Sequence, residues 1–247
     1  MDYPSIKDLK YNYPKNKVNR NHLRLWRWLI IGRLGFYLSW IASRLNLTAN
    51  NITILSFILG LFGIYMLLLG QLFVGLLLIN LWYLFDCADG NLARYYKLKS
   101  KKGKFLDEAL GEIVLIFMWF SIGVGLYRNP DLSITFFNSL NRVDLLIFSA
   151  FSCICITLKN CISFRFTNIY NEGKLDEKIV NKDKKVNFLY KYSKYTWISI
   201  ISFGGLQSPL LLLFSYFDYL GLLVLFYSFL YGIHLFISVI IFANKFN

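Results

Sequence analysis

Long apolar runs alternate with short basic segments along the chain. Six of these runs are about 20 residues long, which is the length that an α-helix needs to cross the hydrocarbon core of a bilayer. They cover residues 51–70, 71–92, 105–127, 143–165, 195–217 and 219–243. The pattern therefore predicts an all-α integral membrane protein with six transmembrane helices.

A different pattern precedes the first run. Apolar and basic positions alternate over residues 25–47, where tryptophans favour the headgroup level of a bilayer and arginines favour lipid phosphates. We expect an amphipathic interfacial helix here, and the first 24 residues have no apolar core typical of a cleavable signal peptide. The predicted organisation is an N-terminal cytoplasmic segment with this juxtamembrane helix over residues 1–48, followed by one six-helix transmembrane domain over residues 49–247.

Composition supports this class. The chain has 247 residues, of which 56% are hydrophobic and 17% are charged, and its mean hydropathy is +0.47. Soluble domains are about 45–50% apolar and about 25% charged. A disordered chain and a small disulfide-stapled secreted domain are excluded by the same numbers.

The positive charge is distributed unevenly. The chain carries 27 Lys and Arg against 14 Asp and Glu, a net charge of +13. With six spans, 25 of the 27 basic residues fall on one side of the membrane, and only Arg128 and Arg142 fall on the other. The positive-inside rule then predicts cytoplasmic termini and a place in the cytoplasmic (inner) membrane. Because the charge is spread over juxtamembrane loops without a nucleic-acid-binding motif, we expect membrane lipids as partners and no nucleic acid.

Three carboxylates gather at the cytoplasmic edge of the predicted spans. Asp86 and Asp89 end the second run, where their spacing puts them on one helix face, and Asp107 opens the third run. A carboxylate costs about 2.5–3.5 kcal/mol at mid-membrane, so such residues are candidates for function. Oxygen ligands of this kind suit Mg²⁺ or Mn²⁺. For either of the first two aspartates alone, pairing with a nearby Lys or Arg is the structural alternative.

Small residues and an arginine follow on the same helix. Gly90 and Ala93 leave room for a bulky group to approach the backbone, and Arg94 offers a forked donor for phosphate oxygens. The combination predicts a site for a phosphate-bearing ligand.

These residues resemble the signature of the CDP-alcohol phosphotransferase family, D-x-x-D-G-x-x-A-R, eight residues, then G-x-x-x-D-x-x-x-D. Seven of its eight fixed positions match over the 26 residues from Asp86 to Gly111. Residues 49–53 also resemble the family's Pro-Asn-x-x-Thr segment, with alanine in place of the proline. Including the spans, the resemblance extends over residues 35–245.

The resemblance implies transfer of a phosphoalcohol group from a CDP-linked donor to an alcohol acceptor, with release of CMP, in phospholipid or lipid-linked polymer synthesis. It implies two Mg²⁺ or Mn²⁺ ions held by Asp86, Asp89 and Asp107. The implied nucleotide-binding residues are Asn50, Asn51, Thr53, Gly90, Ala93, Arg94, Ser100 and Gly103. By analogy with relatives, CDP-diacylglycerol is the expected donor, another CDP-alcohol is the alternative, and a homodimer is expected.

One position departs from the signature. Gly111 replaces the last aspartate, which in the family is a metal ligand and the general base for the acceptor hydroxyl. Glu108 lies about 100° around the helix from Asp107, and Glu112 lies about 100° from Gly111. Either glutamate could replace the missing aspartate as a catalytic carboxylate, together with Asp107. Alternatively, water or a substrate phosphate accepts the proton, because a positioned base contributes only about 10²–10⁴-fold. The third possibility is a catalytically impaired member that acts as a CDP-lipid-binding or assembly subunit.

The acceptor side carries a weaker signal. Lys159 and Arg165, near the inner end of the fourth run, are candidate acceptor-binding residues. Basic side chains at such positions either face a cavity or extend to the membrane surface.

Overall fold

The computed structural model describes residues 3–14, 24–98, 101–129, 141–176 and 199–244. Every regular element in these ranges is helical. The elements are α1 (Ile6–Tyr11), η1 (Arg27–Ile31), α3 (Gly32–Arg44), α4 (Ala49–Leu68), α5 (Leu72–Tyr95), α6 (Lys101–Arg128), α7 (Arg142–Asp176), η2 (Phe203–Gln207), α9 (Ser208–Tyr216) and α10 (Leu220–Ala243). The prediction of an all-α protein is confirmed.

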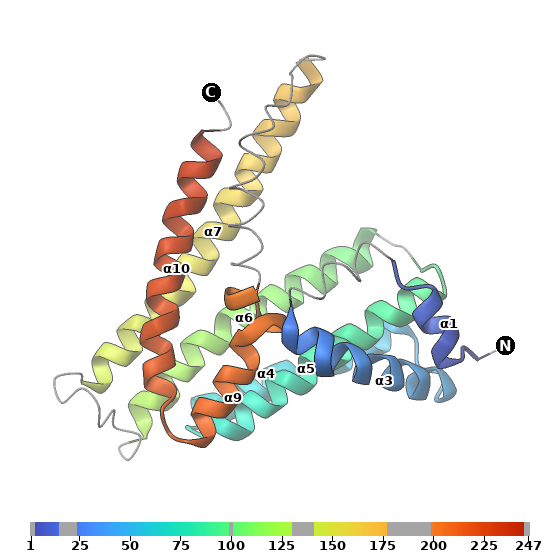
Figure 1. The fold of residues 1–247 in the computed structure, drawn as a ribbon, viewed down its shortest axis with the longest axis horizontal. Coiled ribbons are helices and arrows are strands. Elements are labelled where there is room, and N and C mark those ends of the chain that lie inside the picture. The colour runs from blue at the N-terminus through green and yellow to red at the C-terminus, as the bar shows by residue number, and fades with distance from the viewer. Residues whose placement is uncertain (1–2, 15–23, 99–100, 130–140, 177–198, 245–247) are drawn as a thin grey trace.

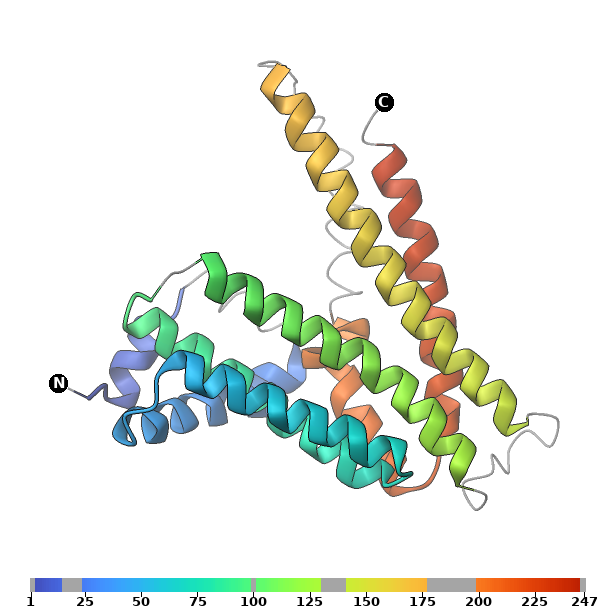
Figure 2. The ribbon, with the colours of Figure 1, turned by 180° about the vertical axis from the view of Figure 1, so that it is seen from behind.

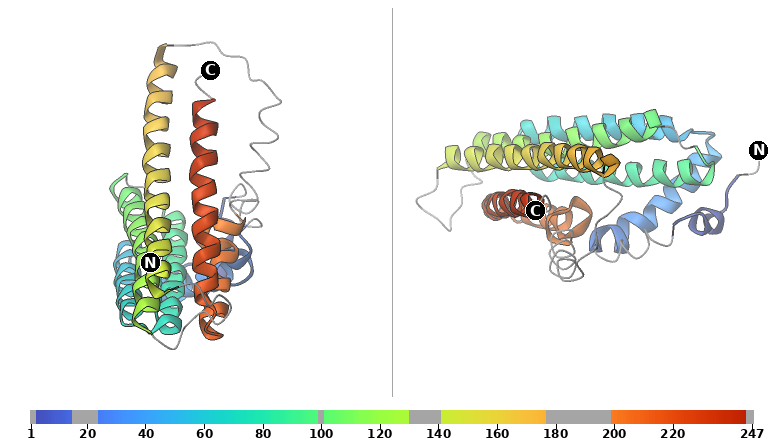
Figure 3. Two further views of the ribbon diagram at one scale, coloured as in Figure 1. Left: turned by 90° about the vertical axis from the view of Figure 1, so that its left-hand side faces the viewer. Right: turned by 90° about the horizontal axis from the view of Figure 1, so that it is seen from above.

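The long helices form two inclined groups (Figure 1, Figure 2). Helix α4 packs on α5 and α6, and these three helices form one bundle. Helices α7 and α10 lie side by side and project beyond the rest of the molecule (Figure 3), while the lower part of α7 packs on α6. Helix α3 lies along α5, and α1 lies beside the end of α5.

Five of these helices are long and apolar enough to cross a membrane, by length and composition. They are Ala49–Leu68, Leu72–Tyr95, Gly103–Arg128, Arg142–Ile169 and Leu220–Ala243. Each corresponds to one of the predicted runs. The described part of the chain is therefore that of an integral membrane helical protein.

The predicted span over residues 195–217 has a different structure in its described part, which begins at residue 199. The π-helical segment η2 contains Gly205, whose backbone is not helical (φ −87°, ψ −128°), and α9 follows with nine residues. Two consecutive glycines weaken the helix, and Pro209 suits the first turn of the new one. The described residues thus contain five long spans, and the count of six is not confirmed.

Helical structure also occupies the predicted interfacial segment, from Arg27 to Arg44. The preceding short helix α1 was not predicted. It begins with a capping box, in which the Ser5 hydroxyl accepts from the Asp8 N–H at 3.2 Å and Asp8 Oδ2 accepts from the Ser5 N–H at 2.9 Å. The Ser5 hydroxyl also donates to Asp8 Oδ2 at 2.6 Å, and this hydrogen bond, together with the one from the Ser5 N–H, holds the pKa of Asp8 below its ordinary value.

A buried amide joins three segments of the fold. Asn80 on α5 accepts a hydrogen bond from Nε1 of Trp26 at 3.0 Å, and the same oxygen accepts from the hydroxyl of Ser208 on α9. Because an unpaired amide would be costly to bury, this arrangement fixes the segment before α3 and the start of α9 against α5.

Close helix crossings set the geometry of the bundle. A Cβ atom at Gly60 on α4 would lie 2.8 Å from Cγ2 of Val114 on α6 and 3.2 Å from Cδ1 of Trp82 on α5. Only glycine lets these three helices approach so closely here. Trp82 lies four residues before Asp86, and Val114 lies seven residues after Asp107, so the crossing is near the predicted carboxylates along both helices.

Candidate active site

Asp89 is buried on α5, with 4% of its surface exposed. The Thr53 hydroxyl on α4 donates to Oδ2 of Asp89 at 2.6 Å and also lies 3.0 Å from the carbonyl oxygen of Ala49. The N-cap residue Thr48, whose hydroxyl accepts from the Asn51 N–H at 3.2 Å, begins α4 at this level. The predicted segment 50–53 is thereby brought next to the aspartates, and Ala49 occupies the first helical position, where proline is also favoured.

Asp86 and Asp107 face one another across α5 and α6. Their side chains are in hydrogen-bonding contact, and Asp89 interacts electrostatically with both. Two carboxyl groups in contact need a shared proton or a cation between them, because like charges at this distance repel. The three predicted carboxylates are therefore close together at one end of the α5–α6 pair, although Asp107 is exposed and Asp89 is buried.

Whether these residues fit a metal ion depends on donor type and placement. All three supply hard oxygen ligands, the type that Mg²⁺ and Mn²⁺ prefer. Among the described residues, however, no group of three or more His, Cys, Asp or Glu side chains is placed so that it could hold a metal ion. The donor chemistry fits, and a preformed three-ligand cluster is not found in this part of the chain.

Arg94 lies one turn beyond Gly90 and is held from several sides. Its Nη2 donates to Oδ1 of Asn91 at 2.7 Å, and its Cζ lies 4.9 Å from the centroid of the Tyr13 ring. A Cβ atom at Gly90 would lie 3.2 Å from both terminal nitrogens of Arg94. Nδ2 of Asn91 in turn donates to the hydroxyl of Ser39 on α3 at 3.3 Å. The guanidinium thus rests over the glycine, near the aspartates.

The remaining predicted nucleotide-binding residues have varied surroundings. Asn50 and Asn51 are exposed in the first turn of α4, Ala93 is half-buried on α5, and Gly103 is half-buried near the start of α6. Ser100 lies outside the described residues.

The family model for CDP-alcohol phosphatidyltransferase matches residues 46–225 of this chain. The chain belongs to this family. No curated protein matches the sequence. The family is a transferase family and generally depends on divalent metal ions.

In this CDP-alcohol phosphatidyltransferase family member, Glu108 is occupied by a surface ion pair. Its Oε1 lies 3.6 Å from Nζ of Lys104, one turn earlier on α6, and both side chains are largely exposed. Pairs of this kind contribute little to stability. Glu112 is also exposed and interacts electrostatically with Lys159 on α7. In this structure Glu108 is therefore paired with a lysine of its own helix.

Gly111 stands opposite Trp82 of α5. A Cβ atom at this position would meet only Cζ2 of Trp82, at 3.9 Å, which is an ordinary van der Waals distance. The helix crossing therefore does not require glycine here, and the position has room for a side chain.

The two candidate acceptor residues differ in environment. Lys159 is half-buried on α7 and interacts with Glu112 on α6 and with His234 on α10. Arg165, further along α7, is exposed. The structure therefore directs only Lys159 toward the neighbouring helices.

Sequence reasoning missed several residues that contact the site. Asn91 orients Arg94, and its position three residues earlier on the same helix was a usable signal. Arg27, from η1, interacts electrostatically with Asp86, and its Cζ lies 5.9 Å from the Tyr83 ring centroid. Tyr13 approaches Arg94 from a segment that carried no sequence signal for the site.

Proposed function

We propose that this protein transfers a phosphoalcohol group, phosphatidyl by preference, from a CDP-linked donor to an alcohol acceptor and releases CMP. The observation that carries the proposal is the convergence of Asp86, Asp89 and Asp107 from two adjacent helices, with Arg94 five residues after Asp89 on α5. Membership of the family supports the same reaction class. The proposed setting is phospholipid or lipid-linked polymer synthesis.

The three aspartates would hold two Mg²⁺ or Mn²⁺ ions. When bound, the ions would neutralise the pyrophosphate and stabilise the negative charge on CMP as it leaves. Thr53 orients Asp89 for this role through the hydrogen bond to Oδ2. The contact between Asp86 and Asp107 supports a shared cation, because it places two negative charges together.

Donor binding would use the groups around Gly90. Arg94 would donate to phosphate oxygens, and the missing side chain of Gly90 keeps the guanidinium close to the helix backbone. Asn50, Asn51, Ala93, Ser100 and Gly103 complete the proposed nucleotide site. CDP-diacylglycerol is the preferred donor, and another CDP-alcohol is the alternative.

In the transfer step, the acceptor oxygen bonds to the phosphorus that carries the donor's alcohol group. The bond from that phosphorus to the bridging oxygen breaks, and CMP leaves with the electron pair. The proton of the acceptor hydroxyl must go to a base, and Gly111 has no side chain that could accept it. Asp107, Glu108 and Glu112 are the candidate proton acceptors on α6, with water or a substrate phosphate as the alternative. Lys159 and Arg165 remain the proposed acceptor-binding residues.

A second candidate function is that of an impaired family member that binds CDP-lipid or assembles with other subunits. Gly111 favours it, because the position lacks the carboxylate that the signature has there. This candidate predicts nucleotide binding without CMP release.

We also propose a place in the cytoplasmic membrane, with the site and both termini on the cytoplasmic side. The basic residues of the short loops support this orientation. Helix α1 and the aspartate-bearing ends of α5 and α6 lie at the same end of the bundle (Figure 1), in agreement with it. A homodimer belongs to the proposal as well, and cross-linking in membranes would test it.

The deciding experiment is a substrate screen with membranes that contain the protein. CMP release and new lipid products would be measured by mass spectrometry for CDP-diacylglycerol and small CDP-alcohols with a panel of acceptors. Asp89→Asn should lower CMP release at least about 100-fold, because metal-assisted charge stabilisation supplies several kcal/mol. Asp218→Asn is the matched control, because Asp218 is an exposed loop residue with φ 61°, a conformation that asparagine also adopts. Absence of CMP release with every pair would refute the enzyme proposal.

A further inference from the structure

The ring of Tyr13 lies on the guanidinium of Arg94. The distance of 4.9 Å from Cζ to the ring centroid is within the range of about 6 Å in which cations and aromatic rings attract. Tyr13 precedes the matched family region, which begins at residue 46. A segment outside the family domain therefore contacts one of its signature residues.

Arg94 is also fixed on its other sides. Asn91 accepts from Nη2, and Asn91 is itself tied to Ser39 of α3. Nε of Arg94 is buried and has no hydrogen-bond partner among the described residues. Ordering a long side chain costs conformational entropy. A guanidinium that is already held in place therefore loses less conformational entropy when it binds an anion than a mobile one does.

Tyr13 is itself anchored by a series of contacts along α1 and α3. Its ring meets Phe36 edge-on at 5.7 Å, and Nζ of Lys10 lies 6.0 Å from the Phe36 ring centroid. At the far end of this segment, Cζ of Arg44 lies 5.2 Å from the ring of Tyr3 and 5.5 Å from that of Trp40. The segment 3–14 thus contacts α3 near both of its ends, and at one of them the Tyr13 ring lies over Arg94.

We propose that Tyr13 is a positioning residue, which holds Arg94 ready to bind the pyrophosphate of a nucleoside-diphosphate alcohol. The inference rests on the proposed function and assigns the N-terminal segment a part in donor affinity. Tyr13 acts through Arg94, so its effect belongs to donor binding rather than to bond breaking.

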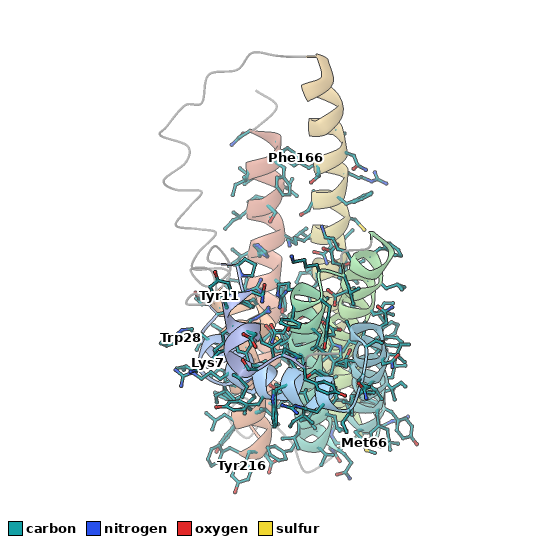
Figure 4. All side chains as sticks on the ribbon, turned by 90° about the vertical axis from the view of Figure 1, so that its right-hand side faces the viewer. Lys7, Tyr11, Trp28, Met66, Phe166 and Tyr216 are labelled. Atoms are coloured by element: carbon teal, nitrogen blue, oxygen red, sulfur yellow. The ribbon has the colours of Figure 1, made fainter. Side chains whose placement is uncertain are left out.

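The first test measures the dissociation constant of CDP with Mg²⁺ on the purified full chain. Tyr13→Ala and Tyr13→Leu should weaken CDP binding about 3- to 30-fold, the range expected for one cation–π contact. Tyr13→Phe keeps the ring face and should bind within about twofold of wild type. The control is Tyr11→Ala, at a position that lies on α1 (Figure 4) and is 90% exposed, where no change is expected.

The second test separates positioning from a general packing role. Tyr13→Ala should raise the KM for the CDP donor and leave kcat at saturating donor within about twofold, because the contact is made equally before and during transfer. In an Arg94→Gln background, Tyr13→Ala should have no further effect on CDP binding, since the two residues act as one unit.

Several results would overturn the inference. Binding by Tyr13→Ala equal to that of wild type would do so, as would tighter binding, which would mean that the ring obstructs the site. An equal loss in the Arg94→Gln background would show that Tyr13 acts elsewhere. These outcomes leave the proposed function intact, whereas a wild-type protein that neither binds CDP nor releases CMP refutes both.

Discussion

The Thr53 hydroxyl donates to Oδ2 of Asp89 at 2.6 Å, although the two residues lie 36 positions apart in the chain. The contact joins the first turns of α4 to the signature aspartate on α5. It explains in physical terms why a small hydroxyl residue near the start of the first span belongs to the same site as the aspartates. The hydroxyl fixes one carboxylate oxygen and thereby the direction of the other.

Thr53→Val should therefore lower CMP release while preserving the fold, because valine has nearly the same shape but no hydroxyl. A hydrogen bond to a charged group contributes about 1.5–3 kcal/mol, which corresponds to a loss of roughly 10- to 150-fold. Thr53→Ser keeps the donor and should retain most of the activity. Wild-type rates for Thr53→Val would show that the contact does not orient Asp89 in the working enzyme.

Gly90→Ala should weaken CDP binding without destabilising the protein. The new methyl group would lie 3.2 Å from both terminal nitrogens of Arg94 and would push the guanidinium out of its position. Alanine is about 1 kcal/mol better than glycine inside a helix, so the thermal unfolding temperature should not fall. Calorimetric titration with CDP and thermal unfolding in detergent would measure the two effects. Gly232→Ala on α10, where the methyl group meets only the Phe151 ring at 3.3 Å, should change neither binding nor activity.

Gly111→Asp tests the missing base. The position has room, because its Cβ would meet only Trp82 at 3.9 Å. If the wild type is a slow enzyme, a carboxylate here should raise CMP release, with an upper range of about 10²–10⁴-fold for a positioned base. Gly111→Asn adds similar bulk without a base and should give no such gain. A protein inert both before and after the change to aspartate would instead support the role of a binding or assembly subunit.

Gly60→Val should destabilise the bundle. Its side chain would collide with Val114 and Trp82, and overpacking of this kind costs about 1–3 kcal/mol. The measurement is the thermal unfolding temperature in detergent, compared with that of Gly111→Ala, which adds a methyl group where there is space. Equal unfolding temperatures for the two variants would contradict the close crossing of α4, α5 and α6.

Removal of divalent cations should abolish CMP release. Membranes treated with EDTA should lose activity to background and regain it with Mg²⁺ or Mn²⁺, because the carboxylates alone cannot neutralise a pyrophosphate. EDTA saturated with Mg²⁺ beforehand is the control for effects of the chelator itself. Undiminished CMP release after chelation would refute the proposed dependence on a divalent metal ion.

Much of the fold could be predicted from hydrophobicity alone. Five apolar runs appear as five long helices, because a run of that length has few alternatives in a membrane protein. The structure of residues 195–217 was harder to predict, because a count of apolar residues does not register that glycines weaken a helix. The break at Gly205 depends on backbone conformation, which a hydropathy pattern does not register.

The site divides in a similar way. Asp86, Asp89 and Arg94 could be found because their spacing repeats a short signature on one helix. The contact of Tyr13 with Arg94 could not, because it joins two distant segments and follows no period. The replacement at Gly111 was visible in the sequence, but the room around it is a property of the neighbouring helix and needed the structure.

The hydrogen bond from Trp26 to Asn80 affects where a shortened version of this chain can begin. A chain shortened to the family boundary at residue 46 would lose the indole donor and leave a buried amide oxygen with only the serine hydroxyl as partner. It would also lose the aromatic cover of Arg94. We therefore expect a fragment that begins at residue 46 to be less stable than the full chain and to hold Arg94 less firmly.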